Sequence, residues 1–181
     1  TLADGGVALD RVAVAAKRAT TITFVRSLLT ATLTRPAFTG CFGLHEWAMV
    51  YRLAPGEVRH EDYPLRLSPT ETDRVVEPPR LRSRHYAADR VFTPVAVPRE
   101  ATPPTGGGQV WQEQPGCLHA GMDVYKWAHK LTPLVPGDVL LDAFELARDI
   151  RVLDMQASPY DLVDLGYAPI RIETPEGKSE Y

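Results

Sequence analysis

Apolar side chains recur at every third or fourth position between residues 12 and 33, a spacing that predicts one long amphipathic helix. Asp10 precedes this stripe and suits an N-cap, and Pro36 follows it and ends the helix. The segment is rich in threonine, which lowers its helix propensity, so contacts with the rest of the protein must hold it. The stripe consists of Val12, Ala15, Ala19, Ile22, Val25, Leu29 and Leu33.

The same spacing predicts two further helices in the C-terminal part, over residues 118–131 and 138–157. Asp138 suits the N-cap of the second of these helices. A short turn or helix is expected over residues 158–166, where a glycine closes it. Thr174 marks the start of a last helix, which we expect to be cut short by the end of the chain.

The segments between these helices are shorter and less regular. Residues 41–52 are mostly apolar, which predicts a buried helix or strand, with helix favoured, and residues 53–67 predict an irregular connection. Ser68 and Glu71 have the spacing of a capping box, so a short helix is expected to begin there and to stop at Pro78.

Two short segments, residues 80–86 and residues 170–172, have the character of β-strands. Residues 94–108 are rich in proline and glycine and predict an internal loop. We therefore expect one domain, residues 1–181, of mainly α class with a few short strands (α+β) and a helical C-terminal half. Because the chain begins with Thr1 rather than Met, the sequence is consistent with the loss of an N-terminal segment.

The composition is that of an average globular protein. The chain has 181 residues, of which 44% are hydrophobic and 24% charged, and its formal net charge is -3. These values argue against a wholly disordered chain. No apolar run approaches the roughly 18 residues that a membrane-spanning helix needs, and no signal peptide is visible. A soluble protein of the cytoplasm, without a membrane partner, is therefore expected.

The charge is unevenly distributed along the chain. Residues 1–137 contain 16 basic and 13 acidic side chains, a net charge of +3, whereas residues 138–181 contain 4 and 10, a net charge of -6. Basic side chains are densest in residues 80–90, so any contact with duplex DNA is expected there. Solvated surface arginines are the alternative. The basic side chains of this segment are Arg80, Arg82, Arg84 and Arg90, with His85 among them.

The chain has two cysteines, Cys41 and Cys117, and no CxxC pair. This number excludes a disulfide framework and favours two reduced, partly buried thiols. The alternative is that Cys117 and His119 contribute to one metal site.

His45 and Glu46 stand in the middle of an apolar segment and are the strongest candidates for chemistry. An ionisable pair in such a place either finds a polar partner or has its pKa values shifted by burial, and shifted groups gather at functional sites. Met49 stands where the zinc-protease pattern HExxH requires histidine, so that family is excluded. A glutamate paired with an arginine inside the core is the structural alternative.

A second constellation lies on the predicted helix 118–131. His119 and Asp123 are four residues apart on one face, which suits a carboxylate-oriented imidazole or two ligands of one metal. An ion pair on the helix surface fits the same spacing. Asp154 and Asp161 are two further candidate carboxylates. Asp154 stands among apolar residues, and Asp161 lies close to it in the sequence.

Five stretches carry a resemblance to a known group of proteins. They are Cys41–Arg52, Gln114–Asp123, Glu145–Arg151, Leu153–Leu162 and Arg171–Gly177. In these stretches, which are distributed over nearly the whole chain, the sequence resembles an actinobacterial group labelled 3-methyladenine DNA glycosylase.

The resemblance implies a DNA-repair hydrolase that flips an alkylated adenine out of duplex DNA and cleaves its glycosidic bond. Such an enzyme needs aromatic side chains to stack the base, a carboxylate to stabilise the sugar cation, and contacts to phosphate. The stacking candidates are Trp47, Tyr125, Trp127 and Tyr160, the catalytic candidates are His45, Glu46, Asp123 and Asp161, and the phosphate-binding candidates are Arg82 and Arg84.

Two other functions stay open from the residues. The first is a metal-dependent enzyme that acts on a small molecule, with one divalent transition metal held by His45, His85 and His119 and by nearby carboxylates. The second is a non-catalytic interaction protein, in which the buried polar residues only specify packing.

Overall fold

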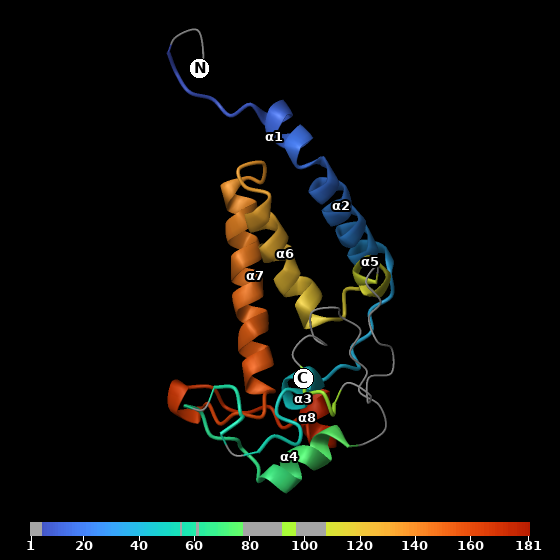
Figure 1. Cartoon of the computed structure of the whole chain (residues 1–181), viewed down its shortest axis with the longest axis vertical. Coiled ribbons are helices and arrows are strands. Elements are labelled where there is room, and N and C mark those ends of the chain that lie inside the picture. The colour runs from blue at the N-terminus through green and yellow to red at the C-terminus, as the bar shows by residue number, and fades with distance from the viewer. Residues whose placement is uncertain (1–4, 55, 61, 78–91, 97–107) are drawn as a thin grey trace.

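The computed structural model describes residues 5–54, 56–60, 62–77, 92–96 and 108–181. The described chain is mostly helical, which confirms the mainly α prediction (Figure 1). Within these ranges the only β-type pairing is an isolated bridge between Leu65 and Tyr160. The strand predicted over residues 170–172 is therefore wrong. The backbone N–H of Ile170 instead donates to the carbonyl of Gln156, the last residue of α7 (Gly137–Gln156). The strand predicted over residues 80–86 lies outside the described residues.

The long N-terminal helix is present as two consecutive helices, α1 (Arg11–Lys17) and α2 (Ala19–Thr34). The side chain of Asp10 accepts a hydrogen bond from the backbone of Ala13, which confirms the predicted N-cap. The predicted stripe is only partly buried, since Leu33 is 85% exposed. The buried face of α2 is centred on Val25, Leu28 and Ala31.

Helices α6 (Leu118–Lys130) and α7 (Gly137–Gln156) lie side by side and run in opposite directions (Figure 1). Gly121 of α6 faces the side chain of Ile150 on α7, whose Cδ1 atom would lie 2.3 Å from an added Cβ and would have to move aside. Both helices match the predicted ranges, but the N-cap of α7 is Pro136 and not Asp138. Asp138 instead lies in the first turn of α7, where a carboxylate is favoured by the helix dipole. No helix among the described residues is long and apolar enough to cross a membrane.

Shorter helices gather around the C-terminal end of α7 (Figure 1). They are α3 (Leu44–Ala48), α4 (Pro69–Val76), the 3-10 helix η3 (Val163–Leu165) and α8 (Pro175–Glu180), and a further short helix, α5 (Gln109–Gln112), contacts α2. The predicted capping box of α4 is confirmed, and residues 41–52 form the short buried helix α3 and its flanking turns. The core of this region contains Trp47, Tyr51, Val76, Phe92 and Ile172.

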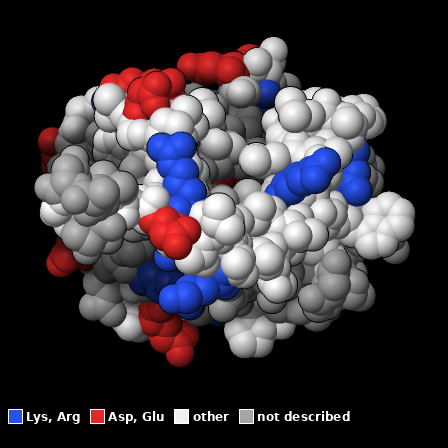
Figure 2. All heavy atoms as spheres, turned by 90° about the horizontal axis from the view of Figure 1, so that it is seen from above, with Lys and Arg blue, Asp and Glu red and all other residues white. Residues whose placement is uncertain are grey.

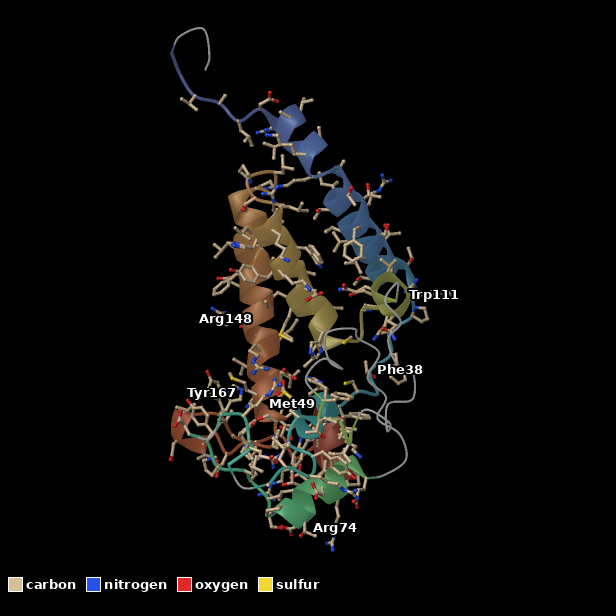
Figure 3. The ribbon with its side chains drawn as sticks, viewed as in Figure 1. Phe38, Met49, Arg74, Trp111, Arg148 and Tyr167 are labelled. Atoms are coloured by element: carbon tan, nitrogen blue, oxygen red, sulfur yellow. The ribbon has the colours of Figure 1, made fainter. Side chains whose placement is uncertain are left out.

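A buried glutamine joins the segment before α3 to the segment before α6. Gln114 accepts hydrogen bonds from the backbone N–H groups of Phe38 and Gly116, both at 2.7 Å, and donates to the carbonyl of Phe38 at 3.1 Å. Figure 3 shows Phe38 on the chain that descends from α2 toward α3. The two backbones touch at Gly116, where an added Cβ would meet backbone atoms of Phe38 at 2.7 Å. This contact fixes how residues 38–45 lie against the start of α6.

We expect Gly116→Ala to lower the free energy of unfolding by about 1–3 kcal/mol, since the backbone of Phe38 cannot yield as a flexible side chain would. Gly137→Ala is the matched control, because nothing lies within 4 Å of its added Cβ and it begins α7. Urea denaturation of both variants checks this. Equal stability of the two variants would contradict the tight contact at Gly116.

Candidate metal centre

Two helices from distant parts of the chain supply one buried polar cluster. α3 carries His45 and Glu46, and the last turns of α7 carry Arg151 and Asp154. Gly43 begins α3 with a left-handed φ of 68°, and a Cβ there would lie 3.2 Å from Cβ of Ala157. A glycine at this position thus permits both the turn into α3 and its close approach to the end of α7.

The imidazole of His45 lies against both carboxylates of the cluster. Its Nε2 atom is 3.2 Å from Oδ1 of Asp154 and 3.5 Å from Oε1 of Glu46. All three residues are buried, and one ligand atom from each lies within 4.8 Å of the other two. Ligands at 2.0–2.1 Å from a tetrahedral cation lie about 3.3 Å from one another. The two nitrogen–oxygen distances fit ligands that share one ion, and they also fit the ion pairs of protonated His45 with the two carboxylates.

Two atoms of this cluster make no hydrogen bond among the described residues, although they lie close together. These atoms are Nε2 of His45 and Oδ1 of Asp154, whose separation of 3.2 Å lacks the alignment of a hydrogen bond. His45 is 2% exposed and Asp154 is 0% exposed. Buried donors and acceptors are almost always satisfied, so this pair requires an explanation.

Arg151 neutralises the outer side of the cluster. Its Nη1 atom donates to Oε1 of Glu46 at 3.1 Å and to Oδ2 of Asp154 at 2.7 Å. The side chain of Arg151 is 48% exposed, whereas those of Glu46 and Asp154 are 10% and 1% exposed. Two carboxylates and one guanidinium leave the cluster with one formal negative charge when His45 is neutral.

The pKa values of His45 and Asp154 are both shifted in this cluster. Burial alone would lower the pKa of His45, but Asp154, Cys41 and Glu46 outweigh burial and raise it well above its ordinary value. Burial alone would raise the pKa of Asp154, but His45 and Arg151 hold it well below its usual range. The cluster therefore attracts one more positive charge at Nε2, either a proton or a cation.

A cavity of about 350 Å³ adjoins the cluster, and His45 forms part of its wall. On this side, Nδ1 of His45 is 3.6 Å from Sγ of Cys41, and the ring of His119 is 4.4 Å from the ring of His45. Cys117 and Lys178 also line the cavity. Burial, followed by the nearby Cys41, raises the pKa of the Cys117 thiol to about 12. His45 therefore separates the cavity from the buried carboxylates.

Of the predicted catalytic residues, the structure brings together His45 and Glu46 only. Asp123 lies on α6 and forms an ion pair with Lys126, which donates to its Oδ2 atom as Gln109 does. Asp161 is exposed and accepts a hydrogen bond from the backbone of Val163 at the start of η3.

The four aromatic candidates do not gather around one pocket. Trp47 is fully buried, and its Nε1 atom donates to the carbonyl of Ala157 at 2.9 Å. Trp127 packs edge-on against Phe24, and Tyr125 packs in the same way against Phe144. Tyr160 is buried and donates from its hydroxyl to the carbonyl of Arg59.

The whole predicted DNA-contacting segment, residues 80–90, lies outside the described residues. It contains the predicted phosphate-binding residues Arg82 and Arg84 and the predicted metal ligand His85. On the face that Figure 2 shows, Lys and Arg side chains lie among Asp and Glu side chains. Contact with duplex DNA therefore stays a prediction.

Sequence analysis missed that Arg151 and Asp154 belong with His45. Their spacing of three residues places them on one helix face, and the apolar neighbours of Asp154 indicated burial. Nothing in the sequence indicated that the end of α7 packs against α3. Of the predicted metal ligands, His45 and His119 do lie together.

No protein family model, curated protein or solved structure matches this chain. The resemblance to the glycosylase group therefore stays a prediction, and the geometry of the cluster carries the functional argument.

We expect the metal-free protein to lose stability as pH rises above about 6.5, because folded His45 keeps its proton after the unfolded chain has lost it. Asp154 has the opposite sign, so its contribution disappears as pH falls below about 4. His45→Gln should remove the decline above pH 6.5, whose slope is at most about 1.4 kcal/mol per pH unit for one proton. Urea denaturation in a chelator measures it.

His129→Gln is the control for this experiment, because that histidine is exposed at the end of α6. It should leave the slope unchanged. An unchanged slope in His45→Gln would show that protonation of His45 is not coupled to folding.

Proposed function

We propose that this protein is a metal-dependent enzyme that acts on a small molecule, and that His45, Glu46 and Asp154 hold a divalent transition metal. The observation that carries the proposal is the close but unaligned contact between Nε2 of His45 and Oδ1 of Asp154. Both atoms are buried and near enough to each other to contact one cation. One imidazole and two carboxylates suit Mn²⁺, Fe²⁺ or Zn²⁺.

The charge of the cluster fits a bound cation. Arg151 balances one of the two carboxylates, and a second positive charge is needed at Nε2. A proton on His45 meets this need through the ion pair between Nε2 and Oδ1 of Asp154 at 3.2 Å. A divalent cation meets the same need and uses both atoms.

The surroundings of the three ligands also fit a metal centre. Histidine ligands usually donate their other ring N–H to a fixed partner, and here Nδ1 of His45 faces the sulfur of Cys41. Arg151 supports Oδ2 of Asp154, which leaves Oδ1 for the cation. When bound, a cation supplies Lewis-acid chemistry.

The neighbouring side chains suggest the kind of molecule that is bound. Among the described residues, the bonds of Arg151 to the cluster use Nη1 alone, and its side chain is half exposed. Its other N–H donors suit a carboxylate or phosphate group of a small molecule. The cavity on the other side of His45 also has the volume of a small-molecule site, but Arg151, Glu46 and Asp154 do not line it.

The alkyladenine hydrolase of the sequence resemblance has less support from this geometry. The cavity contains Phe42 and Tyr181, whereas the four predicted stacking residues lie in other surroundings. Incubation with methylated duplex DNA distinguishes the two functions. Release of 3-methyladenine that survives a chelator and is lost in Glu46→Gln would favour the DNA-repair hydrolase and contradict our proposal.

We expect the purified protein to bind one Mn²⁺ per chain, and Asp154→Asn to weaken this binding at least about 100-fold, because a ligand matters more than a supporting residue. Isothermal titration calorimetry on tag-free protein measures the affinity. Asp161→Asn is the matched control, since this carboxylate is exposed and accepts a hydrogen bond from the backbone of Val163. The proposal would be overturned if none of Mn²⁺, Fe²⁺ and Zn²⁺ binds. It would also be overturned if Asp154→Asn binds Mn²⁺ as tightly as the wild-type protein does.

A further inference from the structure

Four side chains of the kind that zinc prefers line the cavity on the other side of His45. They are Cys41, His45, Cys117 and His119. Two come from the turn before α3 and from α3 itself, and two come from the N-cap and first turn of α6. The proposed function uses the Nε2 atom of His45, so the Nδ1 side of that ring and the other three residues have no part in it.

The sulfur and nitrogen atoms of these residues form two close pairs. Sγ of Cys41 lies 3.6 Å from Nδ1 of His45, and Sγ of Cys117 lies 3.9 Å from Nδ1 of His119. Zinc binds sulfur at about 2.3 Å and nitrogen at about 2.0–2.1 Å, so a sulfur and a nitrogen on one tetrahedral zinc lie about 3.6 Å apart. The first pair has this separation and the second is slightly longer.

The two pairs face each other across a short distance. The rings of His45 and His119 have their centroids 4.4 Å apart and meet edge to face. The four ligand atoms are not already gathered around one point, so binding of one ion requires side-chain rotation that brings the two pairs together.

The fold holds the two segments in this relation. Gln114 binds the backbone of both Phe38 and Gly116, three residues before Cys41 and one before Cys117. The direct backbone contact at Gly116 adds to this restraint. A cation would therefore meet ligands whose backbones are already fixed, and the cavity gives it a way in.

We propose that Cys41, His45, Cys117 and His119 form a second metal site, which takes a thiophilic divalent cation such as Zn²⁺. His45 then faces this site with Nδ1 and the carboxylate cluster with Nε2. The two sites differ in chemistry, because thiolates select zinc and similar cations, whereas carboxylates also suit Mn²⁺.

Cobalt is the probe that tests this site, since Co²⁺ replaces zinc and absorbs in the near ultraviolet when a thiolate is its ligand. The whole 181-residue chain, tag-free and kept reduced, is titrated with Co²⁺. We expect a thiolate-to-cobalt charge-transfer band that Zn²⁺ abolishes by displacement. The band should also appear in Asp154→Asn, which removes a ligand of the carboxylate site alone.

The double variant Cys41→Ser, Cys117→Ser should lose the band and bind Zn²⁺ at least about 100-fold more weakly. Circular dichroism confirms that the variant is folded, and if it is not, the single variant Cys41→Ser should show a weaker band. Absence of the band from folded, reduced wild-type protein at saturating Co²⁺, or an undiminished band in the cysteine variants, would overturn the proposal. Mn²⁺ binding tests the carboxylate site independently, so failure of one site leaves the other standing.

Discussion

The ion cluster between α3 and α7 is the constraint on which the rest of the structure depends. Asp154 is entirely buried, and removal of a carboxylate from water costs several kcal/mol unless partners replace the solvent. Arg151 donates a hydrogen bond to one oxygen of this carboxylate, and Nε2 of His45 lies beside the other. The end of α7 must therefore pack against α3, and the core around Trp47 and Ile172 forms beside this junction.

Close contacts at two glycines help to hold His45 in place at the junction of α3 and α7. Gly43 lets α3 begin close to Ala157, and Gly116 lets the start of α6 touch the backbone of Phe38. As a result His45 stands between two different environments, with carboxylates at one ring nitrogen and thiols at the other. Soft and hard ligands on opposite sides of one imidazole are the basis for the two cation sites of different selectivity that we propose.

The sequence predicted the parts of the fold that local patterns specify. The N-cap at Asp10, the capping box at Ser68 and the helices over residues 118–131 and 138–157 were visible because spacing and capping are local properties. His45 and Glu46 were recognisable as an ionisable pair in an apolar segment. Their partners were not, since Arg151 and Asp154 lie more than a hundred residues away and only tertiary packing brings them together. For the same reason, helix spacing alone could not show that Asp123 pairs with Lys126.

The central claim is that Nε2 of His45 and the carboxylates of Glu46 and Asp154 share one cation. Anomalous scattering from crystals soaked in Mn²⁺ tests it most directly. The account predicts an anomalous peak at about 2.0–2.2 Å from Nε2 of His45 and from an oxygen of each carboxylate. Crystals that show no such peak, with Nε2 of His45 donating an aligned hydrogen bond to Oδ1 of Asp154, would contradict it.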